Sequence, residues 1–249
     1  DTVRRACDPD RYLDRKEALV RALRGAPKRK DFPFLAPPEA AGHRPMTLPE
    51  TGPVLSVVIP YFNMAPFIDD TLASIRASTQ DRLEIVLVND GSTDPVSVAK
   101  LDTLHEAHGF SDTELRILTV PNWGVANARN RGVQAASAPF VTLLDADDMV
   151  APRYYETALL VLTRYDNVSF AGAWIEDFNR GGRIRNWATW NAEPPIQLIM
   201  NQTNCQSLVY KRETYLESGM HDPDLRMFLD DWAGMVSMLA GGHRGVMIP

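Results

Sequence analysis

The stretch Val54-Leu55-Ser56-Val57-Val58-Ile59, which ends at Pro60, decides how the chain is expected to fold. It is short, largely apolar and rich in β-branched residues, as is typical of a strand buried inside a parallel sheet. The next segment, 65–77, carries apolar residues at helical spacing. Together they predict the first β–α unit of an α/β domain.

The alternation of strand and helix continues along the chain. Further strands are expected at 83–88, 115–120, 140–144 and 168–174, and helices at 95–108, 124–136 and 152–164. This order predicts a Rossmann-like α/β fold, with a mostly parallel, doubly wound sheet flanked by helices. After Glu176 the rhythm changes, and we expect a hairpin turn at 180–183, helices at 195–200 and 230–240, and a strand at 206–211.

Residues 1–53 have a different character from the rest of the chain. Residues 10–24 predict an amphipathic N-terminal helix, and seven prolines follow between Pro27 and Pro53. Because proline lacks a backbone donor, this Pro-rich extension is expected to be a linker or strap. We therefore divide the chain into residues 1–53 and an α/β domain at 54–249. The absence of an initial Met and the strand-like end at 246–249 favour a piece of a longer protein with a neighbouring domain, although a trimmed chain would look the same.

Charge and composition exclude several classes of function. The net charge is −6, and residues 53–249 hold 15 basic against 24 acidic residues, which argues against a nucleic-acid partner. No apolar stretch reaches the roughly 18 residues of a membrane span. Cys7 and Cys205 are too few for a disulfide framework and lack zinc-site spacing. We expect a cytoplasmic protein, whose basic segment 1–52 is either a solvated helix or a contact with the cytoplasmic face of a membrane or another domain.

Ligands of such sheets gather beyond the carboxyl ends of the strands. Phe62 follows the first strand and could stack on a nucleobase, or could be a half-buried core residue. Asp90 follows the second strand and could accept a hydrogen bond from a base or a ribose. Its neighbours Ser92 and Asp94 are explained as helix caps, whereas Asp90 is not. Arg129, on the helix after the third strand, suits a phosphate or a facing carboxylate, or is a surface residue.

The strongest local signal is the stretch Leu144-Asp145-Ala146-Asp147-Asp148 after the fourth strand. Three carboxylates this close together repel one another and raise each other's pKa. A divalent cation relieves the repulsion, and Mg²⁺ or Mn²⁺ prefers oxygen ligands completed by phosphate. The alternative is that Asp148 caps the following helix, which leaves Asp145 and Asp147 unexplained.

A second acidic pair, Asp230-Asp231, opens the helix expected at 230–240. One of the two could be a general base for a hydroxyl group, or both could simply favour the helix N-terminus. The histidines offer no cluster: His221 and His243 are interpreted as structural, and His105 and His108 as solvated on a polar helix face.

Taken together, these segments resemble the family-2 glycosyltransferases of the GT-A fold, in the order and at the spacing of that family. The resemblance covers about 54–249 and is carried by five segments: 57–63, 88–94, 124–132, 144–148 and 230–232. One departure is Asn89, where an acid is common in the family. A family member would also continue beyond Pro249 into a lid.

The resemblance implies a role for each matching position. Binding of a nucleotide sugar falls to Pro60, Phe62, Asp90, Arg129, Asp145 and Ala146; Asp147 is similar to the metal-binding acid of the family's Asp-x-Asp motif, and Asp231, with Asp230 beside it, resembles the catalytic base. The implied reaction is inverting transfer, assisted by Mn²⁺ or Mg²⁺, from a nucleoside-diphosphate sugar, with UDP the commonest carrier. The implied acceptor is a hydroxyl of a glycan, a lipid-linked molecule or another acceptor, as in polysaccharide biosynthesis.

Three other functions are less well supported. A sugar nucleotidyltransferase would need a Gly-rich, basic loop after the first strand, where this chain has 61–64, Tyr-Phe-Asn-Met. A dinucleotide-dependent oxidoreductase would need a Gly-x-Gly-x-x-Gly sequence, which does not occur. A degenerate binding module without turnover would have little reason to keep all four acids, Asp90, Asp145, Asp147 and Asp231.

Overall fold

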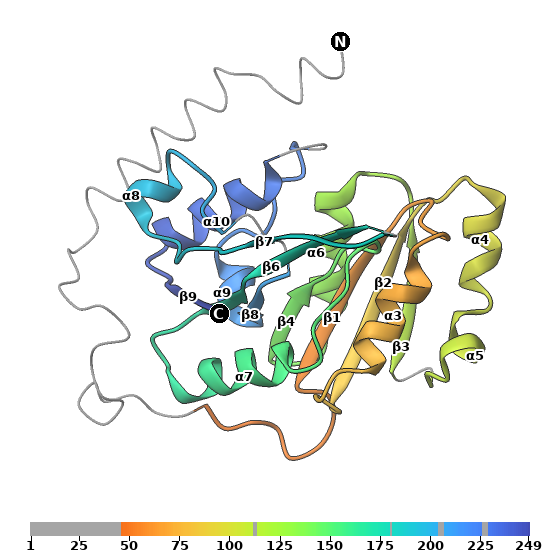
Figure 1. Cartoon of the computed structure of the whole chain (residues 1–249), viewed down its shortest axis with the longest axis horizontal. Helices are drawn as coiled ribbons and strands as arrows, with labels where there is room; N and C mark the ends of the chain where they lie inside the picture. The colour runs from red at the N-terminus through yellow and green to blue at the C-terminus, as the bar shows by residue number, and fades with distance from the viewer. Residues whose placement is uncertain (1–45, 112–113, 180, 204–206, 226–228) are drawn as a thin grey trace, which may run out of the picture.

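The computed structural model describes residues 46–249 apart from 112–113, 180, 204–206 and 226–228 (Figure 1). The helix expected at 10–24, most of the Pro-rich extension and both cysteines lie outside the described residues. The part of the extension that is described is tied to the domain. Met46 donates its backbone N–H to Thr163 O, and Arg82 donates to the carbonyls of Pro49 and Gly52.

The domain is built on one seven-stranded sheet with the order β3-β2-β1-β4-β8-β5-β9. Its strands are β1 (Leu55–Tyr61), β2 (Leu83–Asp90), β3 (Leu115–Val120), β4 (Phe140–Leu143), β5 (Phe170–Ala173), β8 (Val209–Lys211) and β9 (Gly245–Ile248). Strands β1 to β4 are parallel, as are β5 and β9, whereas β8 runs antiparallel to β4 and β5. The predicted mostly parallel sheet is confirmed.

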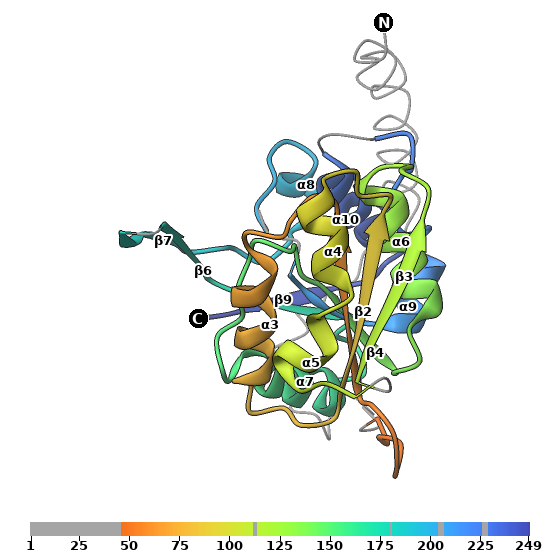
Figure 2. The ribbon, with the colours of Figure 1, turned by 90° about the vertical axis from the view of Figure 1, so that its right-hand side faces the viewer.

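Helices cover both faces of the sheet (Figures 1 and 2). The face that carries Val57 and Ile59 packs against α3 (Ile68–Arg76), α4 (Pro95–Leu101), α5 (Leu104–His108) and α7 (Tyr154–Arg164). The face that carries Val58 packs against α6 (Val125–Ala135), α9 (Arg212–Glu217) and α10 (Asp230–Ala240). Successive side chains of β1 therefore enter opposite cores, which is why the strand is apolar almost throughout.

The order of the strands places the site. From β1 the chain moves outward to β2 and β3 and then returns to β4 on the other side of β1. The carboxyl ends of β1 and β4 thus flank the point at which the winding reverses, where open α/β sheets bind their ligands. A short helix, α8 (Pro194–Gln197), lies beside α10 at the same end of the molecule (Figure 1).

Three details differ from the sequence-based expectations. The helix expected at 95–108 is divided into α4 and α5, with Thr103 donating both its N–H and its hydroxyl to Lys100 O. His105 and His108 are not solvated, because their Nε2 atoms lie 2.7 Å from Leu115 O and 2.8 Å from Asp69 Oδ1. Helix α9 was not expected, since six residues are too few for a clear helical period.

The hairpin expected around 180–183 is confirmed as an antiparallel pair of β6 (Ile175–Asn179) and β7 (Gly182–Trp187). It projects from the body of the domain (Figure 2), and every residue of β7 is exposed. Within the described part of the chain, none of the helices combines the length and the apolar character that crossing a bilayer requires.

Candidate active site

The loops that follow β1 and β2 are joined by Asn63. Its side-chain Oδ1 accepts the backbone N–H groups of Thr93 and Asp94, each at 2.9 Å, and its own N–H donates to Ser92 Oγ. Asn63 has φ 57°, the left-handed conformation that asparagine tolerates better than most residues. Asp94 caps α4 through Ser97 N, as expected. Sequence reasoning did not identify Asn63, although a lone Asn in a loop after a strand was the available signal.

Asp90 lies at the end of β2 and is almost fully buried. Its two carboxylate oxygens accept the backbone N–H groups of Trp123 and Gly124, both at 3.0 Å. Asp90 therefore fixes the turn that leads into α6, a role the sequence analysis did not foresee. Phe62, one residue beyond β1, is 38% exposed, so its ring is accessible at the same edge of the sheet.

Pro60 and Ala146 are less accessible than their expected role in binding suggests. Pro60 is a buried residue of β1 paired with Val88, and Ala146 is buried with its carbonyl accepting Thr71 Oγ1 at 2.8 Å. Neither therefore presents an accessible side chain at this edge of the sheet.

Asp145, Asp147 and Asp148 follow β4, as the sequence predicted. Asp148 does not cap α7, whose N-cap position is Arg153, so the structural alternative for this cluster is wrong. Partial withdrawal of the Asp148 carboxyl from water, together with the charges of Asp145 and Asp147, raises its pKa to about 6. The end of β4 thus holds an excess of negative charge.

This excess is what a divalent cation would offset. In the described part of the chain, no three His, Cys, Asp or Glu side chains form a ready-made metal cage. Asp147 is exposed, and within the described residues no hydrogen bond engages its carboxylate. Because Mg²⁺ and similar ions need only one or two protein carboxylates when phosphate and water complete the shell, Asp147 is a chemically adequate ligand.

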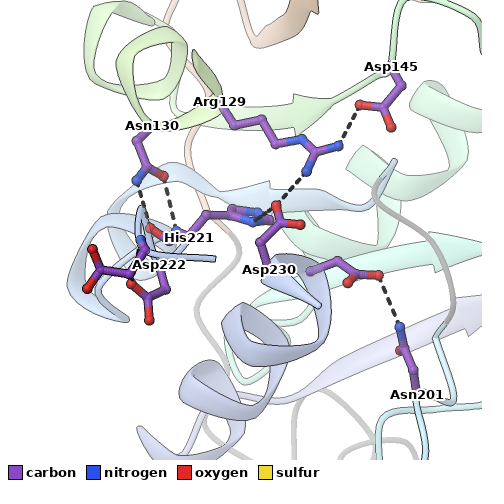
Figure 3. Close-up of polar contacts among 9 residues, drawn as sticks. Arg129, Asn130, Asp145, Asn201, His221, Asp222 and Asp230 are labelled. Carbon is purple, nitrogen blue, oxygen red and sulfur yellow. Dashed lines mark hydrogen bonds and ion pairs between the residues drawn. The ribbon is translucent and has the colours of Figure 1, made fainter. Parts of the chain in front are cut away.

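Arg129 joins the two acidic clusters (Figure 3). Its Nη2 lies 2.7 Å from Asp145 Oδ1 and its Nη1 lies 2.6 Å from Asp230 Oδ2, which is 101 residues away in sequence. Only 4% of Arg129 is exposed. Burial alone would lower its pKa, but the two carboxylates outweigh burial and raise it. Of the open alternatives, the surface residue is excluded and the facing carboxylate is confirmed.

Asp230 and Asp231 differ sharply although both lie in the first turn of α10. Asp230 is buried and accepts from Arg129 and from His221 Nδ1, at 2.9 Å. Burial would raise the pKa of Asp230, but the hydrogen bond from His221 and the charge of Arg129 hold it below its usual value. A carboxylate whose charge is compensated by an arginine and whose pKa is lowered is a poor proton acceptor. Asp231 is partly exposed, and Asn201 Nδ2 donates to its Oδ2 at 3.0 Å.

His221 was expected to be a structural residue, and its contacts are of that kind. It is 3% exposed, and Asn130 brackets its backbone: Asn130 Nδ2 donates to His221 O and His221 N donates to Asn130 Oδ1. Because an ionised carboxylate only accepts, Nδ1 of His221 carries the proton shared with Asp230. Its connection to the acidic pair could not be read from the sequence, since a lone histidine has no spacing signal.

The structure therefore brings most of the expected site residues to one edge of the sheet. Strands β1, β2 and β4 deliver Phe62, Asp90, Asp145 and Asp147, and Arg129 links this edge to the start of α10. The side chains of Pro60 and Ala146 are not presented there. Asn63, His221 and Asn201 are the additions that the tertiary structure makes.

Over most of its length the chain is similar to a known protein family. Residues 56–228 match the model of glycosyl transferase family 2. The chain is 37% identical over 118 residues to the uncharacterized glycosyltransferase YibD of Escherichia coli, covering 47% of this chain and 32% of that protein. The chain thus spans about a third of the length of this relative.

Solved structures share the fold at low sequence identity. TarS of S. aureus in complex with UDP-GlcNAc matches with a TM-score of 0.62 at 17% identity, over 78% of this chain and 56% of that one. The mannosyltransferase PcManGT of Pyrobaculum calidifontis, in complex with GDP-Man and Mn²⁺, matches with a TM-score of 0.58 at 18% identity. The match covers 95% of this chain and 62% of that one. The domain therefore has the GT-A fold, and the chain belongs to glycosyl transferase family 2.

Proposed function

We propose that the domain transfers a sugar from a nucleoside-diphosphate sugar to an acceptor hydroxyl, with inversion at the anomeric carbon. One observation carries the proposal. Arg129 holds Asp145, at the end of β4, and Asp230, at the start of α10, within 2.7 Å of one guanidinium group. The chain segment that carries Asp145 and Asp147 and the helix turn that carries Asp230 and Asp231 are thereby fastened to each other, which supports a shared role for the two acidic pairs.

The donor would bind over the loops after β1 and β2. The accessible ring of Phe62 offers a stacking surface for a base. Asp90 would meet the nucleoside with the lone pairs that its contacts with Trp123 and Gly124 leave open, since each carboxylate oxygen accepts more than one hydrogen bond. We favour a UDP-sugar, in line with TarS, while PcManGT was solved with GDP-Man.

The cation, Mn²⁺ or Mg²⁺, would be held by Asp147 together with the diphosphate. When bound, it supplies positive charge that stabilises the departing nucleoside diphosphate. Asp145 is turned toward Arg129 rather than left to repel the donor's phosphates, which lowers the electrostatic cost of binding an anion beside three carboxylates.

Asp231 would act as the general base. Its carboxylate is accessible, and within the described residues only Asn201 donates to it. It would take the proton of the acceptor hydroxyl while that oxygen attacks the anomeric carbon and the nucleoside diphosphate leaves from the opposite face. A single displacement of this kind inverts the anomeric centre. The acceptor class we propose is a hydroxyl of a glycan or of a lipid-linked sugar.

The test separates binding from transfer. Asp231→Asn should leave the affinity for UDP-GlcNAc with Mn²⁺, measured by calorimetry, within about twofold, and should lower the release of UDP by at least about a hundredfold. Asp147→Asn should instead remove the increase in affinity that Mn²⁺ produces. Asp102→Asn, an exposed residue after α4, serves as the matched control.

Equal loss of binding and turnover in Asp231→Asn, or unchanged turnover, would refute the assignment of the base. GDP-mannose in place of UDP-GlcNAc tests the choice of nucleotide in the same assay. Donor binding without turnover under any of these conditions would favour the degenerate binding module instead.

A further inference from the structure

Asp231 is held by a residue outside its own helix. Asn201, which follows α8 and lies 30 positions earlier, places its Nδ2 3.0 Å from Asp231 Oδ2. Within the described residues this is the one hydrogen bond that the Asp231 carboxylate accepts, so Oδ1 is left for a ligand.

The amide of Asn201 can point in only one direction. Thr203 Oγ1 at 3.0 Å and Gln197 Nε2 at 3.2 Å both donate to Asn201 Oδ1. Since an amide oxygen only accepts and an amide nitrogen only donates, these two donors turn the NH₂ group toward Asp231. The Thr203 hydroxyl could serve either orientation, but the reversed amide would place its NH₂ against the NH₂ of Gln197 and its oxygen against the carboxylate of Asp231.

The residues behind Asn201 are buried and themselves fixed. Gln197 and Thr203 are 0% and 2% exposed. Gln197 Oε1 accepts the backbone N–H of Gln202 at 3.0 Å, and Gln197 O accepts Trp232 Nε1 from the first turn of α10. The segment 197–203 therefore forms a rigid polar support for Asn201, fastened to the same helix that carries Asp231.

We propose that Asn201 is a positioning residue that orients Asp231 toward the acceptor hydroxyl; this rests on the proposed role of Asp231 as the base. Donation to Oδ2 fixes the rotation of the carboxylate and aims Oδ1 at the substrate. An asparagine suits the task because its amide does not titrate, so its hold on the base is the same at every working pH. A misplacement of about 1 Å at a reacting group can cost about a hundredfold in rate.

The alternative is that Asn201 merely fastens the 197–203 segment to α10. Three variants distinguish the two roles: Asn201→Ala, which removes the donor; Asn201→Asp, which keeps the shape but replaces the donor by a negative charge; and Asn186→Ala as control, an exposed residue of β7. Release of UDP from UDP-GlcNAc with Mn²⁺, with water or an added sugar as acceptor, is followed across pH.

A positioning role predicts a specific pattern. Asn201→Ala should lower kcat about ten- to a hundredfold while KM for UDP-GlcNAc stays within about twofold. In Asn201→Ala the acidic limb of the kcat profile should move to higher pH, because the charged form of the base loses a hydrogen-bond donor. In Asn201→Asp it should move further, because the base also gains a like charge beside it. A merely structural role would lower the melting temperature and leave the acidic limb in place.

A second measurement does not depend on turnover. Crystal structures of the wild type and of Asn201→Ala should differ at Asp231. In the variant we expect its carboxylate to be rotated or to occupy more than one conformer, while the backbone of α10 is unchanged. An Asp231 side chain that keeps its orientation in Asn201→Ala would overturn the proposal. The proposal would also be overturned if Asp231→Asn lost turnover while Asn201→Ala kept the wild-type kcat and pH profile. Full turnover in Asp231→Asn would instead refute the proposed function on which this inference rests.

Discussion

At the scale of single residues, burial decides what Arg129 does. The same guanidinium on a surface helix would contribute little, because exposed ion pairs are worth at most about 1 kcal/mol. Here it is buried between Asp145 and Asp230, and His221 supports the second carboxylate. Of the two acids Asp230 is the more buried, so it depends more on the arginine than Asp145 does.

We predict that Arg129→Met lowers the free energy of unfolding by about 3 kcal/mol, measured by urea denaturation, because it leaves Asp230 as a buried, under-compensated charge. Adding Asp230→Asn should recover part of that loss, since the two residues share one interaction.

Arg131→Met is the matched control for this prediction. Arg131 lies two positions further along α6, is exposed, and has its guanidinium 5.4 Å from the centre of the Trp123 ring. It should cost less than about 1 kcal/mol. Equal losses in both variants would show that the buried pairing is not what stabilises the fold.

At the scale of the elements, the side chain of Glu84 joins β2 to β1 and to the turn that precedes β4. It lies on β2 and is 3% exposed, with its carboxylate accepting Ser56 Oγ from β1 and the backbone N–H groups of Ser137 and Ala138, before β4. Burial would raise its pKa, but these hydrogen bonds hold it below the ordinary value of 4.5. Strand and turn are thus joined by one ionised side chain.

The sign of its pH dependence follows from that direction. Since the folded-state pKa is lowered, the stabilisation is present above the ordinary pKa and is lost as pH falls through the folded-state value. We predict that Glu84→Gln costs about 2 kcal/mol of unfolding free energy near neutral pH, and that this cost shrinks in urea titrations below about pH 4. Glu106→Gln, at an exposed position of α5, should change neither the unfolding free energy nor its dependence on pH. A cost that is constant with pH would exclude the ionised carboxylate as its source.

Most of the helices and strands of the sheet's first half could be predicted from the sequence, but some of their contacts could not. Strands β1 to β4 and helix α10 lie where apolar runs and helical spacing predicted them. The division between α4 and α5 was missed, because it depends on Thr103 bonding back to Lys100 rather than on any break in the apolar period. The hydrogen bonds of Asp90 to Trp123 and Gly124 were missed for a similar reason, since they join segments more than 30 residues apart.

At the scale of the whole molecule, β8 joins the two parts of the sheet. It separates β4 from β5, although β5 comes next among the sheet strands in the chain. Val209, its first residue, pairs with Thr142 on one side and Ala171 on the other, and is fully buried. The parallel half that carries the acids and the half that leads to α10 are therefore one sheet.

We predict that Val209→Ala lowers the unfolding free energy by about 2 kcal/mol and that tryptophan fluorescence and circular dichroism still report one coincident transition. Val96→Ala, an exposed residue of α4, is the control and should change stability by less than about 0.5 kcal/mol. Two separate transitions in Val209→Ala would show that the two halves of the sheet fold independently.

The sequence by itself determined the α/β class, the parallel strands and the place of Phe62, Asp90, Asp145 and Asp147 at their carboxyl ends, because local apolar periodicity fixes which face and which end of a strand each residue occupies. Only the tertiary structure decided that β8 enters the sheet, that Arg129 bridges Asp145 and Asp230, and that Asn201 holds Asp231. These contacts join residues 16 to 101 positions apart. No local pattern encodes such a distance, because the contacts form only when helices and loops pack on the sheet, and a buried charge such as that of Asp230 then requires its partner.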